Sequence, residues 1–248
     1  MNTETKNGFS CLSGNFLKIL AAIFMTLDHI GVFIFPRIVF FRMIGRLAFP
    51  IFAYMIAEGA YYTKNKAKYF IRIFLVGLLC QSVLFIIQYK ELYFNILLTF
   101  SLSVILIYSF EFIKKAIIDR NITFIIVYFV IFVALLVVFF YLTKKITFDY
   151  GFFGIIAPLF PSVFRGTASL SKKIKFPDSK YFHVSLLAIP LYLLTLDGWS
   201  IQFYAFLALP LLLLYSEKRG KYRMKYFFYL FYPLHIGIIA IISLILNK

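Results

Sequence analysis

Residues 122–142 read ITFIIVYFVIFVALLVVFFYL, and none of their side chains is charged. A helix needs about 20 predominantly apolar residues to cross the hydrocarbon core of a bilayer. This run is long enough for a complete crossing, so it predicts a transmembrane helix.

The rest of the chain has the same apolar character. Its 248 residues are 62% apolar and 21% aromatic but only 15% charged, and the mean hydropathy is +0.90. Soluble domains carry about half apolar and a quarter charged residues, and a disordered chain could not leave so much apolar surface in water. The composition therefore excludes both classes. It indicates a polytopic membrane protein without a soluble domain, since no polar stretch is long enough to build a core.

Nine apolar windows follow one another along the chain. The sixth and seventh are short, and Pro158, Pro161 and Pro190 inside them would permit tilted or broken helices. We therefore predict an all-α, polytopic transmembrane bundle of about nine helices that forms one domain over residues 1–248. The windows cover residues 16–35, 38–61, 69–88, 94–113, 122–142, 150–164, 182–196, 199–215 and 226–246.

The basic residues test this count, because Lys and Arg accumulate in the cytoplasmic loops of membrane proteins. Nine crossings from a cytoplasmic N-terminus place 17 Lys and Arg residues in inner loops and five in outer ones. The bias predicts a multi-pass protein of the cytoplasmic membrane with its N-terminus inside. It also accounts for the formal charge of +16, so we expect the lipid bilayer as a partner and no nucleic acid.

Neither a disulfide nor a metal site is expected. Cys11 lies in the polar N-terminal arm and Cys80 within an apolar window. The three histidines, His29, His183 and His235, lie on different windows without a nearby ligand pattern. His235 follows Pro233, which would distort its helix, and as a lone histidine it suits a structural role slightly better than a catalytic one.

Ionisable residues within the windows are costly in a membrane and are candidates for function. At a rise of about 1.5 Å per residue, His29 on the first window and Arg46 on the second lie at a similar depth. Asp28 shares that depth, but adjacent helix positions point about 100° apart. We therefore expect Asp28 to pair with an arginine of the second window rather than with His29.

A second polar group lies near the inner ends of the second and third windows. Glu58 and Arg72 are placed to meet across the turn that carries Lys64, Lys66 and Lys68. They form either an ion pair that fixes the hairpin or part of a pocket for an anionic, phosphate-bearing ligand, since Arg and Lys commonly bind phosphate.

Several motifs together resemble the TraX family of membrane proteins. They are dense in the first hundred residues and recur at the C-terminal end. One departure is YSE at residues 215–217, where a Tyr-Asn-Gly turn is expected. The motifs are LDHIG (27–31), IGRLAFP (44–50), AEG (57–59), YFIR (69–72), DYG (149–151) and FYLFYPLH (228–235).

The resemblance implies a membrane-embedded acyltransferase of the wider integral-membrane acyltransferase group. Such enzymes take an acyl group from cytoplasmic acetyl-CoA or another acyl-CoA and pass it to an amine or hydroxyl of an acceptor in or across the membrane. The founding TraX activity is acetylation of the N-terminal amine of a conjugative pilin. The acceptor here stays open among a pilin-like peptide, a glycan, a lipid and a peptide natural product.

We expect the chemistry to involve His29 as general base or transient acyl carrier. Arg46 would stabilise the oxyanion of the thioester carbonyl, and Asp28 would tune the pair. No metal is needed for this chemistry. The residues expected to bind the acyl-CoA donor are Arg72, Glu58, Lys68, His235 and Arg42.

Two other functions stay open. A proton-coupled small-molecule transporter could use Asp28, His29, Arg46 and Glu58 as a relay. The nine windows, the lack of an evident duplicated half and the motifs argue against it. A non-catalytic assembly factor or scaffold would not need intramembrane His and Arg. Binding of an acyl-CoA separates the enzyme from both.

Overall fold

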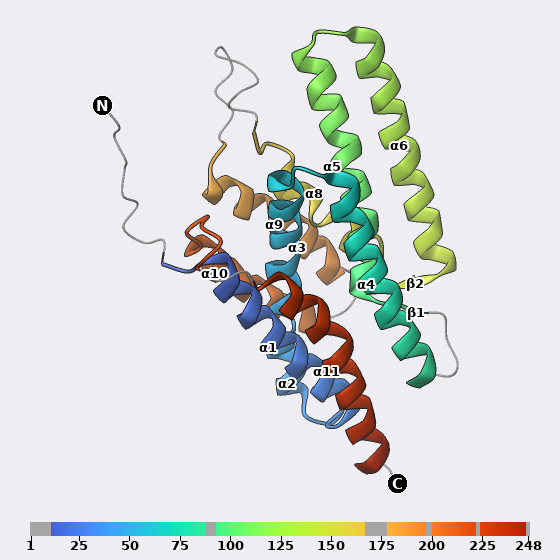
Figure 1. The fold of residues 1–248 in the computed structure, drawn as a ribbon, viewed down its shortest axis with the longest axis vertical. Helices are drawn as coiled ribbons and strands as arrows, with labels where there is room; N and C mark the ends of the chain where they lie inside the picture. The colour runs from blue at the N-terminus through green and yellow to red at the C-terminus, as the bar shows by residue number, and fades with distance from the viewer. Residues whose placement is uncertain (1–10, 88–92, 167–177, 197–199, 222–223, 247–248) are drawn as a thin grey trace.

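The computed structural model describes residues 11–87, 93–166, 178–196, 200–221 and 224–246, which are mostly helical (Figure 1). The predicted all-α class is confirmed. Two short strands, β1 (Tyr93–Phe94) and β2 (Thr147–Phe148), pair in parallel. The helices are α1 (Gly14–Phe33), α2 (Val39–Gly45), α3 (Ala48–Tyr62), α4 (Lys66–Ile87), α5 (Ile96–Ile118), α6 (Ile122–Lys145), α7 (Gly151–Ile156), α8 (Leu159–Ser162), α9 (Lys180–Leu196), the 3-10 helix η2 (Ser200–Leu207), α10 (Ala208–Leu213) and α11 (Lys225–Leu246).

Within the described ranges, five helical segments are long and apolar enough to cross a membrane: α1, α2 with α3, α4, α5 and α6. The other four windows contain shorter apolar helices, between Gly151 and Ser243. The number of crossings and the cytoplasmic N-terminus stay predictions. Gln88 and Trp199, where two predicted windows end or begin, lie outside the described residues.

The uncharged run forms α6. Asn121 caps its N-terminus by accepting a hydrogen bond from the backbone N–H of Phe124 at 3.1 Å. The helix packs on α5, and the two form a hairpin that projects at the top of Figure 1. Only 11% of the apolar window of α6 is buried inside the protein. Such an exposed apolar surface suits contact with lipid acyl chains, because the backbone polar groups of the helix interior are paired within the helix.

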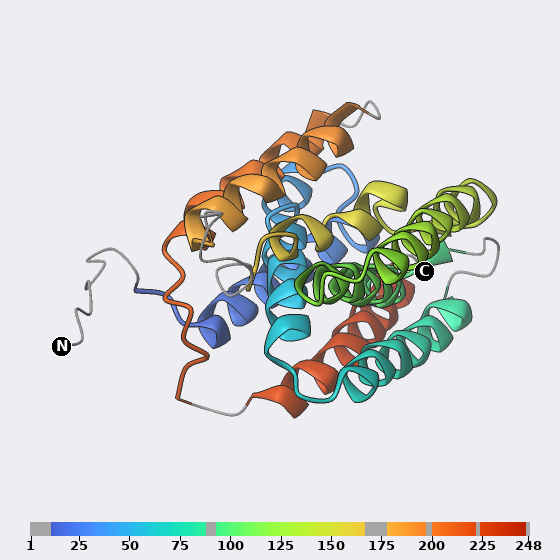
Figure 2. The same cartoon turned by 90° about the horizontal axis from the view of Figure 1, so that it is seen from above.

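The second window is broken between α2 and α3, at Arg46 and Leu47. Pro50 has no N–H to donate to the carbonyl of Arg46, so a continuous helix would lose that hydrogen bond. Beyond the break, α3 passes through the middle of the molecule, between α9 and α10 on one side and α4 and α11 on the other (Figure 2).

The sixth window is also broken, which is one of the two forms that its prolines permit, and Pro158 precedes α8. A tight turn precedes α7: Tyr150 has φ 60° and Gly151 has φ 55°, a region that favours glycine. The turn is held because the hydroxyl of Thr99 donates to the carbonyl of Asp149 at 3.1 Å. It places Tyr150 against Phe49, with ring centroids 4.0 Å apart.

Candidate functional site

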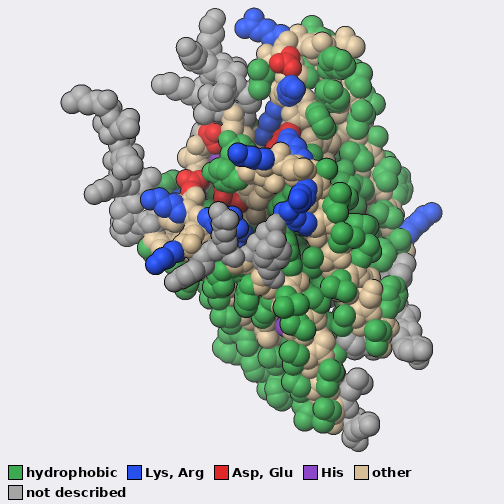
Figure 3. All heavy atoms as spheres, viewed as in Figure 1, with side chains coloured by type: hydrophobic (Ala, Val, Ile, Leu, Met, Phe, Trp, Pro, Cys, Tyr) green, Lys and Arg blue, Asp and Glu red, His purple; other side chains and the backbone are tan. Residues whose placement is uncertain are grey.

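A cavity of about 640 Å³ is lined chiefly by α1, α3, α4 and α11. Toward the start of α1 the lining carries cations from two helices and two loops, which we call the cationic mouth: Lys18, Lys64, Arg72 and Arg219. The carboxylates of Glu58 and Glu217 also line the cavity. Figure 3 shows Lys and Arg side chains gathered on one part of the molecular face, above a largely apolar surface. The far end of the cavity is apolar and is lined by Met25, Phe52, Phe100, Phe231 and Tyr232.

The cavity follows one face of α1. Lys18, Ala22 and Met25 line it, and their spacing of four and three residues puts them in one stripe on the helix. His29 comes four residues after Met25, so it continues this stripe past the apolar end of the cavity.

The same relation holds on α11. Phe228, Phe231 and Tyr232 line the cavity, and His235 follows them at the next positions of the same stripe. The ring of His235 stacks on Phe231, with centroids 5.0 Å apart. The two cavity-facing stripes therefore both lead to a histidine.

These histidines contact each other and form what we call the histidine pair. Nδ1 of His29 lies 2.9 Å from Nε2 of His235, and the imidazole centroids are 5.0 Å apart. Nδ1 of His235 lies 3.0 Å from the carbonyl oxygen of Phe231. The prediction of a lone His235 was wrong, because hydropathy does not give the relative register of α1 and α11.

Asp28 points away from the histidine pair, toward the break in the second window. Both of its carboxylate oxygens accept hydrogen bonds from Nη2 of Arg46 at 2.5 Å, and Nε of Arg42 lies 3.9 Å from one of them. The expected pairing of Asp28 with an arginine of the second window is confirmed. The guanidinium of Arg46 also lies over the ring of Tyr150, 5.5 Å from its centroid.

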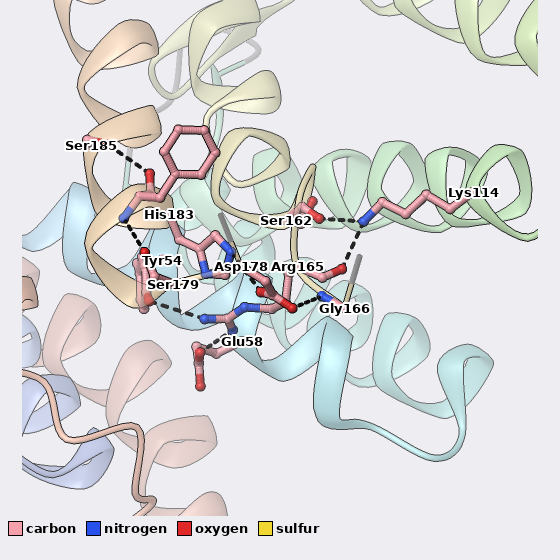
Figure 4. A network of polar contacts seen from close by, with 11 residues as sticks. Tyr54, Glu58, Lys114, Ser162, Arg165, Gly166, Asp178, Ser179, His183 and Ser185 are labelled. Atoms are coloured by element: carbon pink, nitrogen blue, oxygen red, sulfur yellow. Dashed lines mark hydrogen bonds and ion pairs between the residues drawn. The ribbon is translucent and has the colours of Figure 1, made fainter. Parts of the chain in front are cut away.

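The ion pair expected between Glu58 and Arg72 is wrong, although both residues line the cavity. Glu58 forms its ion pair with Arg165, which follows α8 (Figure 4). The hydroxyl of Tyr215 donates to the Glu58 carboxylate at 3.1 Å, and Nη2 of Arg165 donates to the hydroxyl of Tyr54 at 3.1 Å. Burial lowers the pKa of the Arg165 guanidinium, but the Glu58 carboxylate beside it raises this pKa above its ordinary value.

The structure divides the predicted donor-binding residues into two groups. Arg72 and Glu58 line the cavity, and His235 contacts its lining through Phe231. Arg42 and Lys68 lie outside the cavity lining. Arg42 lies beside Asp28, and Lys68 is exposed. Lys64 lines the mouth where Lys68 was expected, since the turn before α4 directs only some of its lysines toward the cavity.

Sequence reasoning missed two residues that contact the predicted ones: Arg165, which pairs with Glu58, and Tyr150, which lies against Arg46. Arg165 directly follows an apolar window, but no spacing rule links it to Glu58. Tyr150 stands in the DYG motif, which could have marked it. Within the described ranges, no three His, Cys, Asp or Glu side chains form a group that could hold a metal ion.

The family model described as "TraX protein" matches residues 13–243. The chain belongs to the TraX family. Its apolar helices and its membership of TraX together indicate a membrane protein.

Two relatives of this TraX chain match over short stretches. The uncharacterized protein RP591 of Rickettsia prowazekii (strain Madrid E) is 38% identical over 95 residues, which are 38% of this chain and 36% of the relative. A probable fimbrial assembly protein, FimC of serogroup H1, from Dichelobacter nodosus is 32% identical over 69 residues, 26% of this chain and 28% of the relative. The matches thus span about a third of these relatives. No solved structure matches.

The motifs by which the sequence resembles TraX proteins meet in space. Residues 27–31 and 228–235 supply the histidine pair, and residues 44–50 supply the arginine that binds Asp28. Residues 57–59 and 69–72 each supply two lining residues of the cavity: Glu58 and Gly59, and Tyr69 and Arg72. Motifs far apart in this TraX sequence therefore surround one cavity and the polar groups at its end.

Proposed function

We propose that this TraX protein is a membrane-embedded acyltransferase that takes an acetyl group from acetyl-CoA. The observation that supports this most is the cavity, which leads from the cationic mouth along an apolar passage to Phe231, the lining residue on which His235 stacks. Lys18 and His29 are about 16 Å apart along α1, a distance that an extended pantetheine arm covers. The phosphates of the donor would meet the mouth, and the thioester would lie near the histidines.

The reaction needs a proton acceptor where the apolar passage ends. His29 takes the proton from the N–H or O–H of the acceptor, whose nitrogen or oxygen bonds to the thioester carbonyl carbon. The C–S bond then breaks, and His29 returns the proton to the sulfur of CoA. His29 could instead carry the acyl group transiently: its ring nitrogen bonds to the thioester carbonyl carbon as the C–S bond breaks and the CoA thiolate leaves. The nitrogen or oxygen of the acceptor then bonds to that carbon as the bond to His29 breaks, and the proton of the acceptor passes to the thiolate.

Arg46 is suited to stabilise negative charge near His29. Its Nη2 is engaged by Asp28, but its buried Nε has no hydrogen-bond partner among the described residues. A buried donor of this kind can face the oxyanion that forms at the thioester carbonyl. Asp28 would then hold the guanidinium in place.

The acceptor is proposed from the similarity to a fimbrial assembly protein. The name of the Dichelobacter nodosus relative refers to fimbrial assembly, and fimbriae are built from protein subunits at the cell surface. We therefore propose the N-terminal amine of a pilin-like subunit as the first acceptor to test, ahead of a glycan or a lipid.

The proposal is tested with purified protein in nanodiscs and radiolabelled acetyl-CoA. Wild type is expected to bind acetyl-CoA and to transfer label to a pilin-like peptide, whereas His29→Ala binds it and transfers at least about 100-fold more slowly. His183→Ala is the matched control, because His183 contacts Asp178 and lies outside the cavity lining.

Two results would contradict the proposal. Wild type that does not bind acetyl-CoA is not an acyl-CoA enzyme, and the proton-coupled transporter becomes the better candidate. Full transfer by folded His29→Ala would remove His29 from the reaction.

A further inference from the structure

We infer that His235 is a positioning residue that fixes the tautomer of His29, so that Nε2 of His29 is the atom that takes the acceptor proton. This inference deepens the proposed function and rests on it. The tautomer itself follows from the contacts of the two rings alone, and each step can be checked separately.

His235 bonds to the backbone of its own helix. Its Nδ1 lies 3.0 Å from the carbonyl oxygen of Phe231. A carbonyl oxygen only accepts hydrogen bonds, so Nδ1 of His235 must carry the hydrogen. In the neutral ring, Nε2 of His235 is then left with a lone pair.

The proton position on His235 determines the proton position on His29. Nε2 of His235 lies 2.9 Å from Nδ1 of His29, a distance that requires one hydrogen between the two nitrogens. Because Nε2 of His235 has only a lone pair, Nδ1 of His29 donates. Nε2 of His29 is therefore unprotonated and can act as a base.

The reverse arrangement is disfavoured. If Nε2 of His235 donated to His29, Nδ1 of His235 would turn a lone pair toward the lone pairs of the Phe231 carbonyl at 3.0 Å. No ion pair within the described ranges includes His29 or His235. The nearby carboxylate of Asp28 is engaged by Arg46, so it does not hold a proton on either ring.

This arrangement also gives the acceptor proton a place to go. When Nε2 of His29 takes a proton, its Nδ1–H already points at Nε2 of His235. The second ring can accept that proton while its own Nδ1–H stays bonded to Phe231. Positive charge then spreads over the histidine pair, as in other sites where a second group orients a catalytic imidazole.

The tautomers are measured by NMR on protein with 13C,15N-labelled histidine in nanodiscs. Variants that lack one histidine at a time assign the three rings. We expect Nδ1–H tautomers for both His29 and His235 in wild type. His235→Phe removes the acceptor while keeping a ring, so His29 should shift toward the Nε2–H form. His235→Gln keeps an acceptor at a similar reach and should preserve the Nδ1–H form.

The transfer assay gives the second readout. His235→Phe should lower kcat about 100-fold with little change in the KM for acetyl-CoA, and His235→Gln should recover at least about tenfold of that loss. If His235 only supports the fold, the loss of kcat in each variant should follow its loss of unfolding free energy.

The outcomes separate the two proposals. An Nε2–H tautomer of His29 in wild type overturns the inference, whatever the transfer rate. Nδ1–H tautomers in a protein that does not bind acetyl-CoA leave the hydrogen-bond chain intact but remove the proposed function, and with it the role of Nε2 as the proton acceptor.

Discussion

Asp28 on α1 accepts hydrogen bonds from Nη2 of Arg46 through both carboxylate oxygens, each at 2.5 Å. The side chains are 17% and 6% exposed. Arg46 stands where the second window breaks between α2 and α3. The ion pair therefore ties the break to the helix that carries His29.

Removal of either partner should destabilise the protein, because the other charge stays buried without a counter-charge. We expect Asp28→Asn and Arg46→Gln each to lower the free energy of unfolding by about 3–5 kcal/mol. The double variant should lose less than the sum of the two. Denaturant titration followed by circular dichroism measures this coupling, and additive losses would show that the two side chains do not interact in solution.

The close approach of α1 and α2 depends on a glycine. A Cβ on Gly45 would lie 2.4 Å from Cβ of Asp28, whereas a Cβ on Gly237 of α11 would meet its nearest neighbour, Val83, at 4.0 Å. Gly45→Ala should cost at least about 1–3 kcal/mol through overpacking. Gly237→Ala is the matched control and should be neutral or slightly stabilising. Equal melting temperatures for the two variants would refute this packing.

The donor-binding part of the cavity can be tested with two basic residues of one helix. Arg72 lines the cationic mouth, and Lys68, one turn earlier on α4, is exposed and outside the lining. Arg72→Gln should weaken acetyl-CoA binding at least about tenfold, through loss of a charge-assisted hydrogen bond. Lys68→Gln should change the Kd less than about twofold. Equilibrium binding at constant ionic strength measures both Kd values. Equal changes in Kd would show that acetyl-CoA is attracted by the overall positive charge and not by Arg72 in the cavity.

Much of the fold could be predicted because hydropathy is a local property. The apolar composition of residues 122–142 is enough to predict α6, and the prolines of the sixth window permitted its break near Pro158. Pairings between distant segments could not be predicted in the same way. Glu58 on α3 pairs with Arg165, which follows α8, and His29 on α1 contacts His235 on α11. Each contact depends on the register at which the two segments pack. Apolar windows do not specify those registers, and only Asp28, on a neighbouring window, was placed near its partner.

The ion pair of Glu58 with Arg165 provides the last prediction. Both side chains are almost fully buried, and Arg165 also donates to Tyr54. Arg165→Gln should therefore cost about 3–5 kcal/mol, because it leaves the Glu58 carboxylate buried without a cation. The control is Lys66→Gln, which removes the ion pair of Lys66 with Glu111, whose side chains are 48% and 22% exposed. Exposed pairs contribute about 0–1 kcal/mol. Denaturant titration measures the loss of unfolding free energy in each variant. Equal losses would contradict the prediction that the buried pair stabilises the fold more than the exposed one.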